Sequence, residues 1–433
     1  MLDTFVRVGR FARSDFFLQS AIVFASSMLI NALGYLFHFA ISRRIGVVQY
    51  GELSALNAAY MICLTVAGIF ATIVVKYVAE LRAAGDAERL AAFARRVTVV
   101  TGIVSLVAIG AGILAARAIG DFLRIDDLRA ITFTVAIIGL TFCVGPMRAV
   151  FQGVEEFVAF SLLSTIESML KAALGIAFVY AGYGVAGAFG GWTIGTIVAL
   201  LASLGAIARR FRGVAPVPLY IDVRRLAQTA ANVAAAMLML TVLGYFDVLI
   251  VKHYADPTTA GLYGAISLAG KILLFFVAFV PTIALPKATR IALSGKSAMP
   301  VFLQAMGLVV AISTAGLFVY ALFPGFIVTA LAGAAFAPAA PYVFSYGVAT
   351  VFLAALNVVV TYKIGIHRFD FLVPLGVVTI AEIAGVSLHH RTLSDVIAVL
   401  LAGNAAALAI TLLGIDAPRA HARAVTSSAD AAA

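Results

Sequence analysis

Twelve long apolar segments, each of roughly 18 to 27 residues, run along this chain from Phe16 to Gly414. A helix needs about 20 apolar residues to cross a bilayer core of about 30 Å. Inside hydrocarbon, an open strand or loop leaves its backbone groups unpaired, so only helices and closed barrels span a membrane. The segments therefore predict an all-α integral membrane protein with about 12 transmembrane helices.

Composition supports this fold class and excludes several functions. Hydrophobic residues make up 63% of the chain, charged residues make up 12%, and the mean hydropathy is +1.08, which is far from the soluble range. The net charge of +10 could indicate a nucleic-acid partner, but the basic residues lie in short connections between apolar segments. We therefore predict no nucleic-acid partner. The connections are also too short to hold a folded catalytic domain.

The first predicted span, Phe16–Ser42, follows Arg7, Arg10 and Arg13. It is too long for the apolar core of a secretory signal and lacks a convincing cleavage site, so we interpret it as a retained helix. The other predicted spans are residues 51–75, 97–116, 130–147, 157–182, 184–208, 226–251, 261–286, 298–323, 337–362, 371–388 and 396–414.

Basic residues fix the predicted orientation. A cytoplasmic N-terminus places 21 of the 30 Lys and Arg residues on the cytoplasmic side, as the positive-inside rule requires. The sequence thus predicts a multi-pass protein of the inner (cytoplasmic) cell membrane with both termini in the cytoplasm. Connections at 76–96 and 209–225 are the largest on that side.

The connector at 209–225 divides the chain into a predicted N-lobe (1–208) and a predicted C-lobe (226–414) of six helices each. The lobes echo one another, because LGYL at Leu33–Leu36 and LGYF at Leu243–Phe246 each precede a Tyr-Gly pair. Both lobes start on the same side, which predicts an axis along the membrane normal with a site between them. Residues 415–433 are rich in Ala and Ser, and we predict that they form a disordered, dispensable cytoplasmic tail.

Three motifs resemble a known family. ISRRIG at Ile41–Gly46, RAVFQGVEEF at Arg148–Phe157, and the stretch from Asp247 to Tyr263 are similar in order and spacing to motifs of the Wzx-like lipid-linked oligosaccharide flippases. Those proteins share a superfamily with the MATE drug exporters and the lipid II flippases. Twelve helices suit the Wzx-like proteins better than the lipid II flippases, which have fourteen.

The resemblance implies a V-shaped, MATE-like pair of six-helix lobes that works by alternating access. Its implied substrate is a polyprenyl-diphosphate-linked oligosaccharide, moved from the inner to the outer leaflet for O-antigen or exopolysaccharide biosynthesis. Membrane lipids and the polysaccharide polymerase machinery are the other implied partners. An antiporter that exports small organic cations remains the alternative, and a membrane-embedded polysaccharide polymerase is less favoured.

No nucleotide, metal or nucleophile motif occurs in a suitable context, so we predict no enzyme activity, no cofactor and no metal site. An ion gradient or pull by the substrate is then the driving force. Ionisable residues inside spans mark functional groups or buried pairs, because they are costly in hydrocarbon.

Lys271 is the strongest substrate-binding candidate, because it lies deep in its span with no acidic residue three or four positions away. Its ammonium could meet a diphosphate or a sugar acid. Alternatively it pairs with Asp247 or extends to the interface. Asp247 could instead pair with Lys252, or bind a coupling proton or sodium ion. By the resemblance, Asp247 is a candidate for substrate gating as well as ion coupling.

Five further residues complete the predicted site. Glu167 and Lys171 lie four apart on one helical face, where they can neutralise each other; otherwise Lys171 would bind substrate and Glu167 the coupling ion. His38 is a further substrate-binding candidate, and Glu382 is an ion-coupling candidate, although each could simply bond to a neighbouring helix. Arg148 is predicted to lie in a loop at the cytoplasmic mouth, where it could attract anions.

Overall fold

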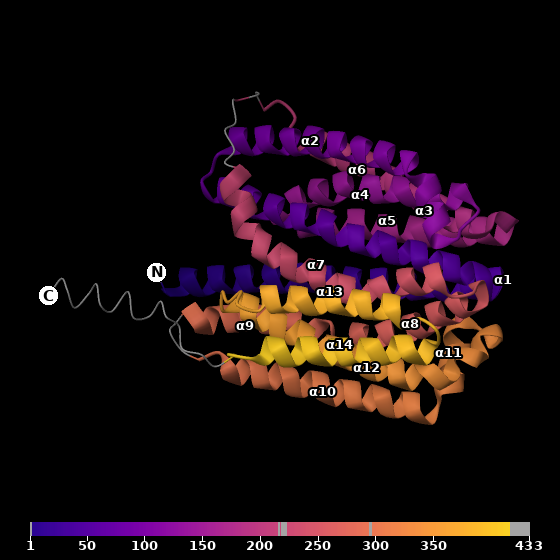
Figure 1. The fold of residues 1–433 in the computed structure, drawn as a ribbon. Helices are drawn as coiled ribbons and strands as arrows, with labels where there is room; N and C mark the ends of the chain where they lie inside the picture. The colour runs from indigo at the N-terminus through magenta and orange to yellow at the C-terminus, as the bar shows by residue number, and fades with distance from the viewer. Residues whose placement is uncertain (1, 215–216, 218–222, 294–296, 416–433) are drawn as a thin grey trace.

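The computed structural model describes residues 2–214, 217, 223–293 and 297–415, and the predicted tail lies outside these ranges except for Ile415. All the regular elements in these ranges are helical (Figure 1). They are α1 (Leu2–Ala83), α2 (Ala87–Leu114), α3 (Ala116–Leu123), α4 (Leu128–Gly153), α5 (Phe157–Phe178), the π turn η1 (Val179–Tyr183), α6 (Gly184–Arg210), α7 (Val223–Tyr254), α8 (Pro257–Val277), α9 (Phe279–Leu293), α10 (Met299–Leu322), α11 (Pro324–Ala332), the 3₁₀ turn η2 (Ala334–Ala339), α12 (Ala340–Gly365), α13 (Leu372–Leu388) and α14 (Leu393–Leu412).

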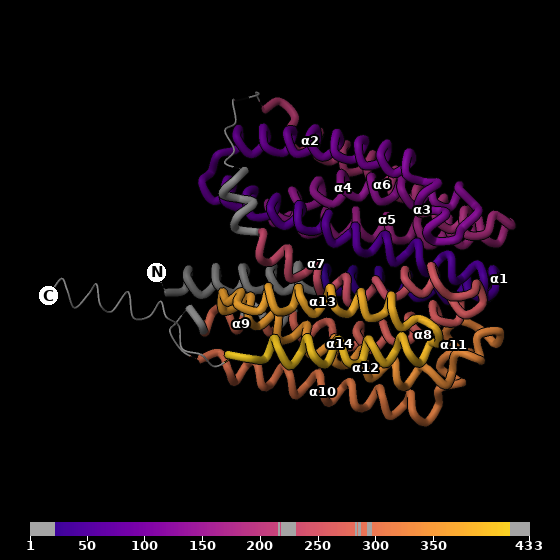
Figure 2. Tube along the Cα trace, in the orientation of Figure 1, coloured from indigo at the N-terminus to yellow at the C-terminus, as the bar shows by residue number. Residues whose placement is uncertain are grey.

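Helix α1 is a hairpin rather than one rod. Gly46 has φ 76° and ψ 179°, which a glycine adopts readily, and it is the only non-helical residue within α1. Figure 2 shows the two arms folded back on each other. Their side chains meet, since the Tyr50 hydroxyl lies 3.2 Å from Nδ1 of His38. The connection that the sequence predicts between Ser42 and Gly51 is therefore helical, except at Gly46.

The described chain crosses the bundle twelve times, as predicted. Nine of its apolar helical stretches are long enough to span a membrane. Two of them, Ile22–Ala83 and Phe157–Arg210, each contain a bend, at Gly46 and at Gly182 in η1. The shorter apolar helix Leu372–Leu388 adds the remaining crossing.

The bundle has two ends. We call the end with the Gly46 bend and Asp256 the distal end, and the end where α1 begins and α14 stops the proximal end (Figure 1). At the proximal end, the predicted connection at 76–96 is wrong in length, because α1 and α2 continue through most of it and leave only residues 84–86 outside helices. Asp86 caps α2 by accepting a hydrogen bond from the Arg89 amide at 3.0 Å.

The helices form two lobes, which confirms the predicted MATE-like architecture. Figure 1 shows α2 to α6 in one group and α8 to α14 in the other, with α7 crossing between the groups. The arms of α1 pack on α4 and α5 of the first group, on α8 of the second group, and on α7. Helix α1 thus contacts both groups.

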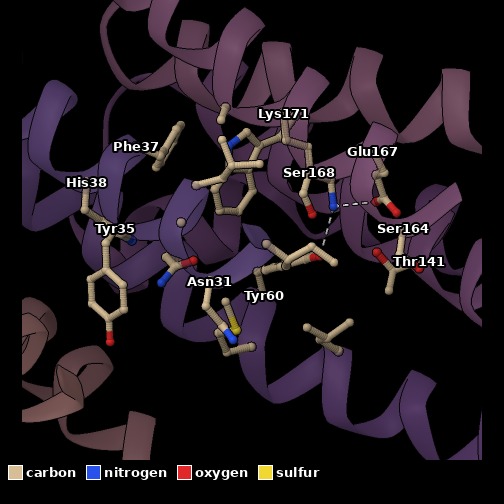
Figure 3. Close-up of a pocket in the computed structure, with 18 of the residues that line it drawn as sticks. Asn31, Tyr35, Phe37, His38, Tyr60, Thr141, Ser164, Glu167, Ser168 and Lys171 are labelled. Carbon is tan, nitrogen blue, oxygen red and sulfur yellow. Dashed lines mark hydrogen bonds and ion pairs between the residues drawn. The ribbon is translucent and has the colours of Figure 1, made fainter. Parts of the chain in front are cut away.

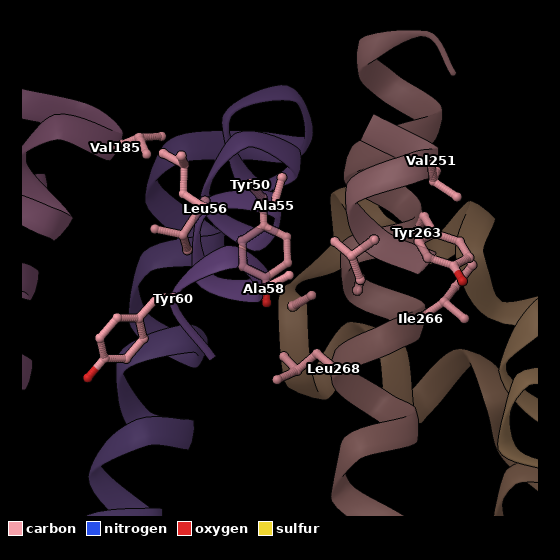
Figure 4. Close-up of a cluster of buried hydrophobic side chains, with 14 of the residues drawn as sticks. Tyr50, Ala55, Leu56, Ala58, Tyr60, Val185, Val251, Tyr263, Ile266 and Leu268 are labelled. Carbon is pink, nitrogen blue, oxygen red and sulfur yellow. The ribbon is translucent and has the colours of Figure 1, made fainter. Parts of the chain in front are cut away.

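The lobes meet tightly at the distal end. Tyr50 and Tyr263 are fully buried there, in a cluster that joins the second arm of α1 to α8 (Figure 4). A Cβ added to Gly261 would overlap the Val47 carbonyl oxygen, and one added to Gly51 would lie 2.9 Å from the Gly261 amide nitrogen. Only glycine permits this backbone approach, so these positions let α1 and α8 pack closely at the distal end.

Helix termini strengthen this distal closure. The Arg43 guanidinium donates hydrogen bonds to the carbonyls of Thr329, Ala330 and Leu331 in the last turn of α11, at 2.7 to 3.2 Å. A cation at a helix C-terminus is favourable, because it meets unpaired carbonyls and the negative end of the helix dipole. Asp256 caps α8, and hydrogen bonds from the Thr259 hydroxyl and amide lower the pKa of that carboxyl.

Candidate functional site

A cavity of about 430 Å³ lies between the lobes in the middle of the bundle. Both arms of α1, together with α4 to α8, supply its walls. The cavity gathers five of the seven predicted site residues, which are His38, Arg148, Glu167, Lys171 and Lys271. Figure 3 shows the N-lobe part of this wall, with Lys171 directed toward Glu167 and Tyr60.

The N-lobe charge cluster consists of Arg148, Glu167 and Lys171. One oxygen of Glu167 accepts from Lys171 Nζ at 2.6 Å, and the other accepts from the Arg148 guanidinium at 2.7 Å. The Thr196 hydroxyl also donates to Glu167, at 3.2 Å. Glu167 is only 5% exposed, and these donors satisfy both of its oxygens. The predicted Glu167–Lys171 pair is confirmed.

Close packing of α5 and α6 positions this cluster. A Cβ added to Gly195 would lie 2.9 Å from the Lys171 backbone nitrogen, and one added to Gly191 would overlap the backbone at Gly175. Small residues at such contacts let membrane helices approach closely. The approach brings Thr196 of α6 within hydrogen-bond distance of Glu167 on α5.

The predicted loop position of Arg148 is wrong. Helix α4 continues to Gly153, so Arg148 lies inside it and lines the central cavity. Its guanidinium also donates to the Ser164 hydroxyl at 3.2 Å. Its buried Nε has no hydrogen-bond partner among the described residues.

Lys271 sits on the C-lobe side of the same cavity. Its Nζ donates to the Ser267 hydroxyl at 2.8 Å and lies 4.1 Å from the centre of the Tyr245 ring. The Tyr35 hydroxyl donates to the Lys271 carbonyl at 3.4 Å, so both tyrosines of the repeated LGY motif adjoin Lys271. Within the described ranges, no carboxylate forms an ion pair with this ammonium group.

Asp247 makes neither of the predicted direct pairs in the part of the chain that the structure describes. Its Oδ2 accepts from the Tyr263 hydroxyl at 2.5 Å and from the Tyr346 hydroxyl at 2.9 Å. Lys252 instead donates to the Arg124 carbonyl at 3.3 Å. Hydroxyl donors from α8 and α12 therefore hold this carboxylate, and Lys271 reaches it only through intervening side chains.

Asp247 and Glu382 line a second, small cavity of about 10 Å³ in the C-lobe. Its other walls are entirely hydrophobic side chains of α7, α13 and α14. Asp247 Oδ1 and Glu382 Oε2 are buried and have no hydrogen-bond partner among the described residues. A Cβ on Gly403 would overlap Glu382 Oε2, so this glycine of α14 makes room for the carboxylate. We call this pair of carboxylates the acid pair.

The central cavity is electropositive. Arg148, Lys171 and Lys271 line it against the single carboxylate of Glu167, which leaves a formal excess of two positive charges. Such charges act strongly where water is limited, because the effective dielectric constant is low. Asn31 and Asn57 add neutral hydrogen-bonding groups to the wall.

Two further cavities lead from the centre toward the proximal end. The first, of about 340 Å³, shares Arg148 and Ser164 with the central cavity. The second, of about 410 Å³, shares Gly68 and Thr72 with the first and extends to Lys76 between α1 and α7. The route is mainly apolar, and it runs away from the distal closure.

His38 also lines the central cavity, and its bond to Tyr50 fits the interpretation as a packing residue. The hydroxyl groups of Tyr60, Ser267 and Tyr346 contact the charged residues directly, and none of these three residues was predicted from the sequence. Polar aromatic residues within apolar spans are the signal that could have indicated two of them, because a buried hydroxyl needs a partner.

Solved structures share this fold. One described as an inward-facing multidrug resistance MATE family transporter has a TM-score of 0.78 at 12% identity, covering 91% of this chain and 97% of its own. The lipid II flippase MurJ in an inward closed conformation has a TM-score of 0.68 at 12% identity, and the match covers 92% of this chain and 87% of MurJ. A Pyrococcus furiosus transporter of the MOP superfamily, described by the reverse polarity of its binding pocket, has a TM-score of 0.65 at 15% identity. That match covers 92% of this chain and 95% of the transporter. No curated protein matches the sequence.

Two lobes, twelve crossings and a charged cavity between the lobes define a multi-pass membrane protein with the architecture of a transporter. The chain belongs to the family described as "Polysaccharide biosynthesis protein", whose model matches residues 17–292. This family and the transporter neighbours agree with the prediction that the chain is a transporter or flippase and not an enzyme.

Proposed function

We propose that this protein is a flippase that moves a polyprenyl-diphosphate-linked oligosaccharide from the inner to the outer leaflet of the cytoplasmic membrane. The observation that carries the proposal is the excess of two positive charges in the central cavity. A diphosphate is the anionic part of such a lipid, and Arg and Lys bind phosphate oxygens well. Family membership supports a role in making polysaccharides.

The cavity suits the rest of this headgroup. Its volume of about 430 Å³ is in the range of ordinary ligand pockets, which span about 300 to 1,000 Å³. Asn31, Asn57 and Ser168 can bond to sugar hydroxyls, while Tyr60 and Trp192 offer aromatic faces. The apolar cavity between α1 and α7 leaves room for a lipid chain that trails from the head.

The closed distal end supports a direction of loading. By the excess of basic residues, we assign the proximal end and both termini to the cytoplasm. The cavities then lead to the inner leaflet, where the substrate is made, and the distal closure blocks the outer one. Similarity to structures described as inward-facing and inward closed fits this assignment. A polysaccharide polymerase on the outer side is the partner that would consume the product.

For the coupling ion we propose a proton on the acid pair. Two carboxylates with free oxygens in a small apolar cavity repel each other unless one positive charge joins them. Described side chains supply no third carboxylate, histidine or cysteine that would complete a metal cage. The cavity is about the size of one water molecule, which leaves little room for a hydrated ion.

An exporter of organic cations is less favoured. Such a transporter needs acidic groups that face the central cavity, and among the described residues only Glu167 does so. Two cations already neutralise that carboxylate.

Reconstituted liposomes test the proposal. They would contain a labelled polyprenyl-diphosphate oligosaccharide, and an impermeant reagent would report how fast inner-leaflet label becomes accessible. We expect acceleration by the wild type, loss of most of it in Lys271→Gln, and wild-type rates in Lys287→Gln, whose side chain is exposed on α9. No acceleration by the wild type would refute the proposed function. A sodium requirement at constant pH would refute the proton assignment.

A further inference from the structure

Two buried hydroxyl groups connect the central cavity with the small C-lobe cavity that holds the acid pair. Ser267 of α8 accepts a hydrogen bond from Lys271 Nζ at 2.8 Å, and its Oγ lies 3.2 Å from the Tyr346 hydroxyl of α12. The Tyr346 hydroxyl also reaches Asp247 Oδ2 at 2.9 Å. We call Ser267 and Tyr346 the hydroxyl bridge. It forms a continuous chain from the ammonium group in the central cavity to the acid pair.

The bridge has fewer hydrogens than acceptors. Tyr346 has one hydroxyl hydrogen, yet both Asp247 Oδ2 and Ser267 Oγ lie within reach of it. Ser267 likewise has one hydrogen. Exposure of Tyr346 and Ser267 is only 6% and 2%, so bulk water cannot supply the missing partner. The direction in which these two hydroxyl groups donate must therefore depend on whether Asp247 is ionised.

We propose that the hydroxyl bridge couples proton occupancy of the acid pair to the strength with which Lys271 holds an anion. With Asp247 ionised, Tyr346 donates to the carboxylate, Ser267 donates to Tyr346, and Lys271 donates to Ser267. All the donated hydrogens then point toward the negative charge of Asp247. The hydrogen bond to Ser267 keeps the Lys271 ammonium group at the hydroxyl bridge.

When a proton from solution joins Asp247, that carboxylate no longer requires the Tyr346 hydrogen. Tyr346 can then turn to donate to Ser267, and the pull of the carboxylate on Lys271 ends. The bound proton also removes a negative charge from beside the cavity, which favours an anion at Lys271. Linkage requires the reverse as well, so a bound anion strengthens proton binding by the same factor.

Packing around Tyr346 positions its hydroxyl group next to Asp247 and Ser267. A Cβ on Gly270 would overlap the Tyr346 ring, so glycine at this position of α8 admits the ring. The Tyr263 hydroxyl donates to the same Asp247 oxygen at 2.5 Å and keeps that carboxylate in place when Tyr346 turns. Tyr346 is therefore a positioning residue that acts through Asp247 and Ser267.

Other titratable groups surround this chain and must be controlled. Asp247 is faced by Lys271 and Tyr263 of α8, by Tyr346 of α12 and by Glu382 of α13, and Tyr245 adjoins it on its own helix. On the central-cavity side, His38 lies near Lys271, and a charge on its imidazole would change anion binding there independently of the acid pair. His38→Gln therefore serves as the background for the test.

The test rests on the proposed function and separates its failure from that of the bridge. Full-length protein in phosphatidylcholine nanodiscs would be titrated with a prenyl methyl phosphodiester, whose single charge stays constant between about pH 5.5 and about pH 8. In the His38→Gln background we expect about tenfold tighter binding at the lower pH. Tyr346→Phe should reduce this ratio to less than about twofold. The matched control Tyr342→Phe, also on α12, should keep the ratio.

A ratio that survives unchanged in Tyr346→Phe would overturn the bridge while leaving the flippase in place. Failure of the probe to bind at either pH would refute the proposed function itself. If Tyr346→Phe does not fold, Ser267→Ala breaks the same chain on α8 and should lower the ratio to the same extent. Retention of the ratio in Ser267→Ala would equally overturn the inference.

Discussion

The two lobes handle buried charge in opposite ways. In the N-lobe cluster, Glu167 contacts both of its cations directly at 2.6 and 2.7 Å, and a hydroxyl completes its coordination. In the C-lobe, hydroxyl groups separate Lys271 from Asp247, and two carboxylate oxygens lack partners among the described residues. The first arrangement fixes a charge, and the second can change one.

This difference assigns different tasks to the lobes. A carboxylate with two ion pairs stays ionised, so the N-lobe cluster presents a constant excess of one positive charge to the cavity. A carboxylate beside another carboxylate in an apolar cavity gains or loses a proton more readily. A transport cycle needs both properties, namely a permanent attraction for the headgroup and a step that alters it.

Removal of the N-lobe carboxylate should give the largest effect. Glu167→Gln leaves Arg148 and Lys171 buried without a counter-charge, which should lower the free energy of unfolding by about 3 kcal/mol. Asp247→Asn breaks no ion pair and should cost about 1 kcal/mol. Unfolding of both purified variants in the same detergent measures the difference. Equal losses would contradict the contrast between the lobes.

Glycines beside the two sites offer a second comparison. In Gly195→Ala the new methyl group meets the backbone of α5 at Lys171, so the helices must separate, at a cost of about 2 kcal/mol. In Gly403→Ala the methyl group meets side-chain atoms of Glu382 and no backbone, and a side chain can move more easily than a helix, so the cost should be about 1 kcal/mol. The same unfolding measurement tests this order. A greater loss in Gly403→Ala would show that the acid pair is the more rigid site.

Cavity cations should differ in their effect on binding. Lys271→Gln should weaken binding of the prenyl methyl phosphodiester about tenfold, because no described carboxylate neutralises this ammonium group. Lys171→Gln should weaken it about threefold, because Arg148 remains beside Glu167 and the loss is shared. Titration at one pH measures both. Similar losses in the two variants would mean that the headgroup lies between the lobes and does not distinguish them.

The sequence predicted the fold class well for a simple reason. Apolar length and the bilayer thickness fix the number of crossings, so twelve spans were visible without any tertiary information. The ends of the spans are harder to predict, because a charged residue that is paired inside the bundle can lie within a helix. Arg148 shows the error, since α4 carries it inside the bundle, where Glu167 offsets its charge.

The candidate site was only partly visible in the sequence. The Glu167–Lys171 pair follows from helical spacing, and it is present. The hydroxyl bridge is different, because Asp247, Ser267 and Tyr346 come from three helices with no fixed spacing. Packing through Gly270 and Gly403 brings these groups together, and one sequence contains no sign of which helices touch.

Charge selectivity of the central cavity tests the account most directly. Two amphiphiles with the same prenyl chain, one ending in a methyl phosphodiester and the other in a trimethylammonium group, would compete for the wild-type protein in nanodiscs at neutral pH. The positive excess around Arg148, Lys171 and Lys271 predicts at least about tenfold preference for the anion. Equal binding, or a preference for the cation, would contradict the account.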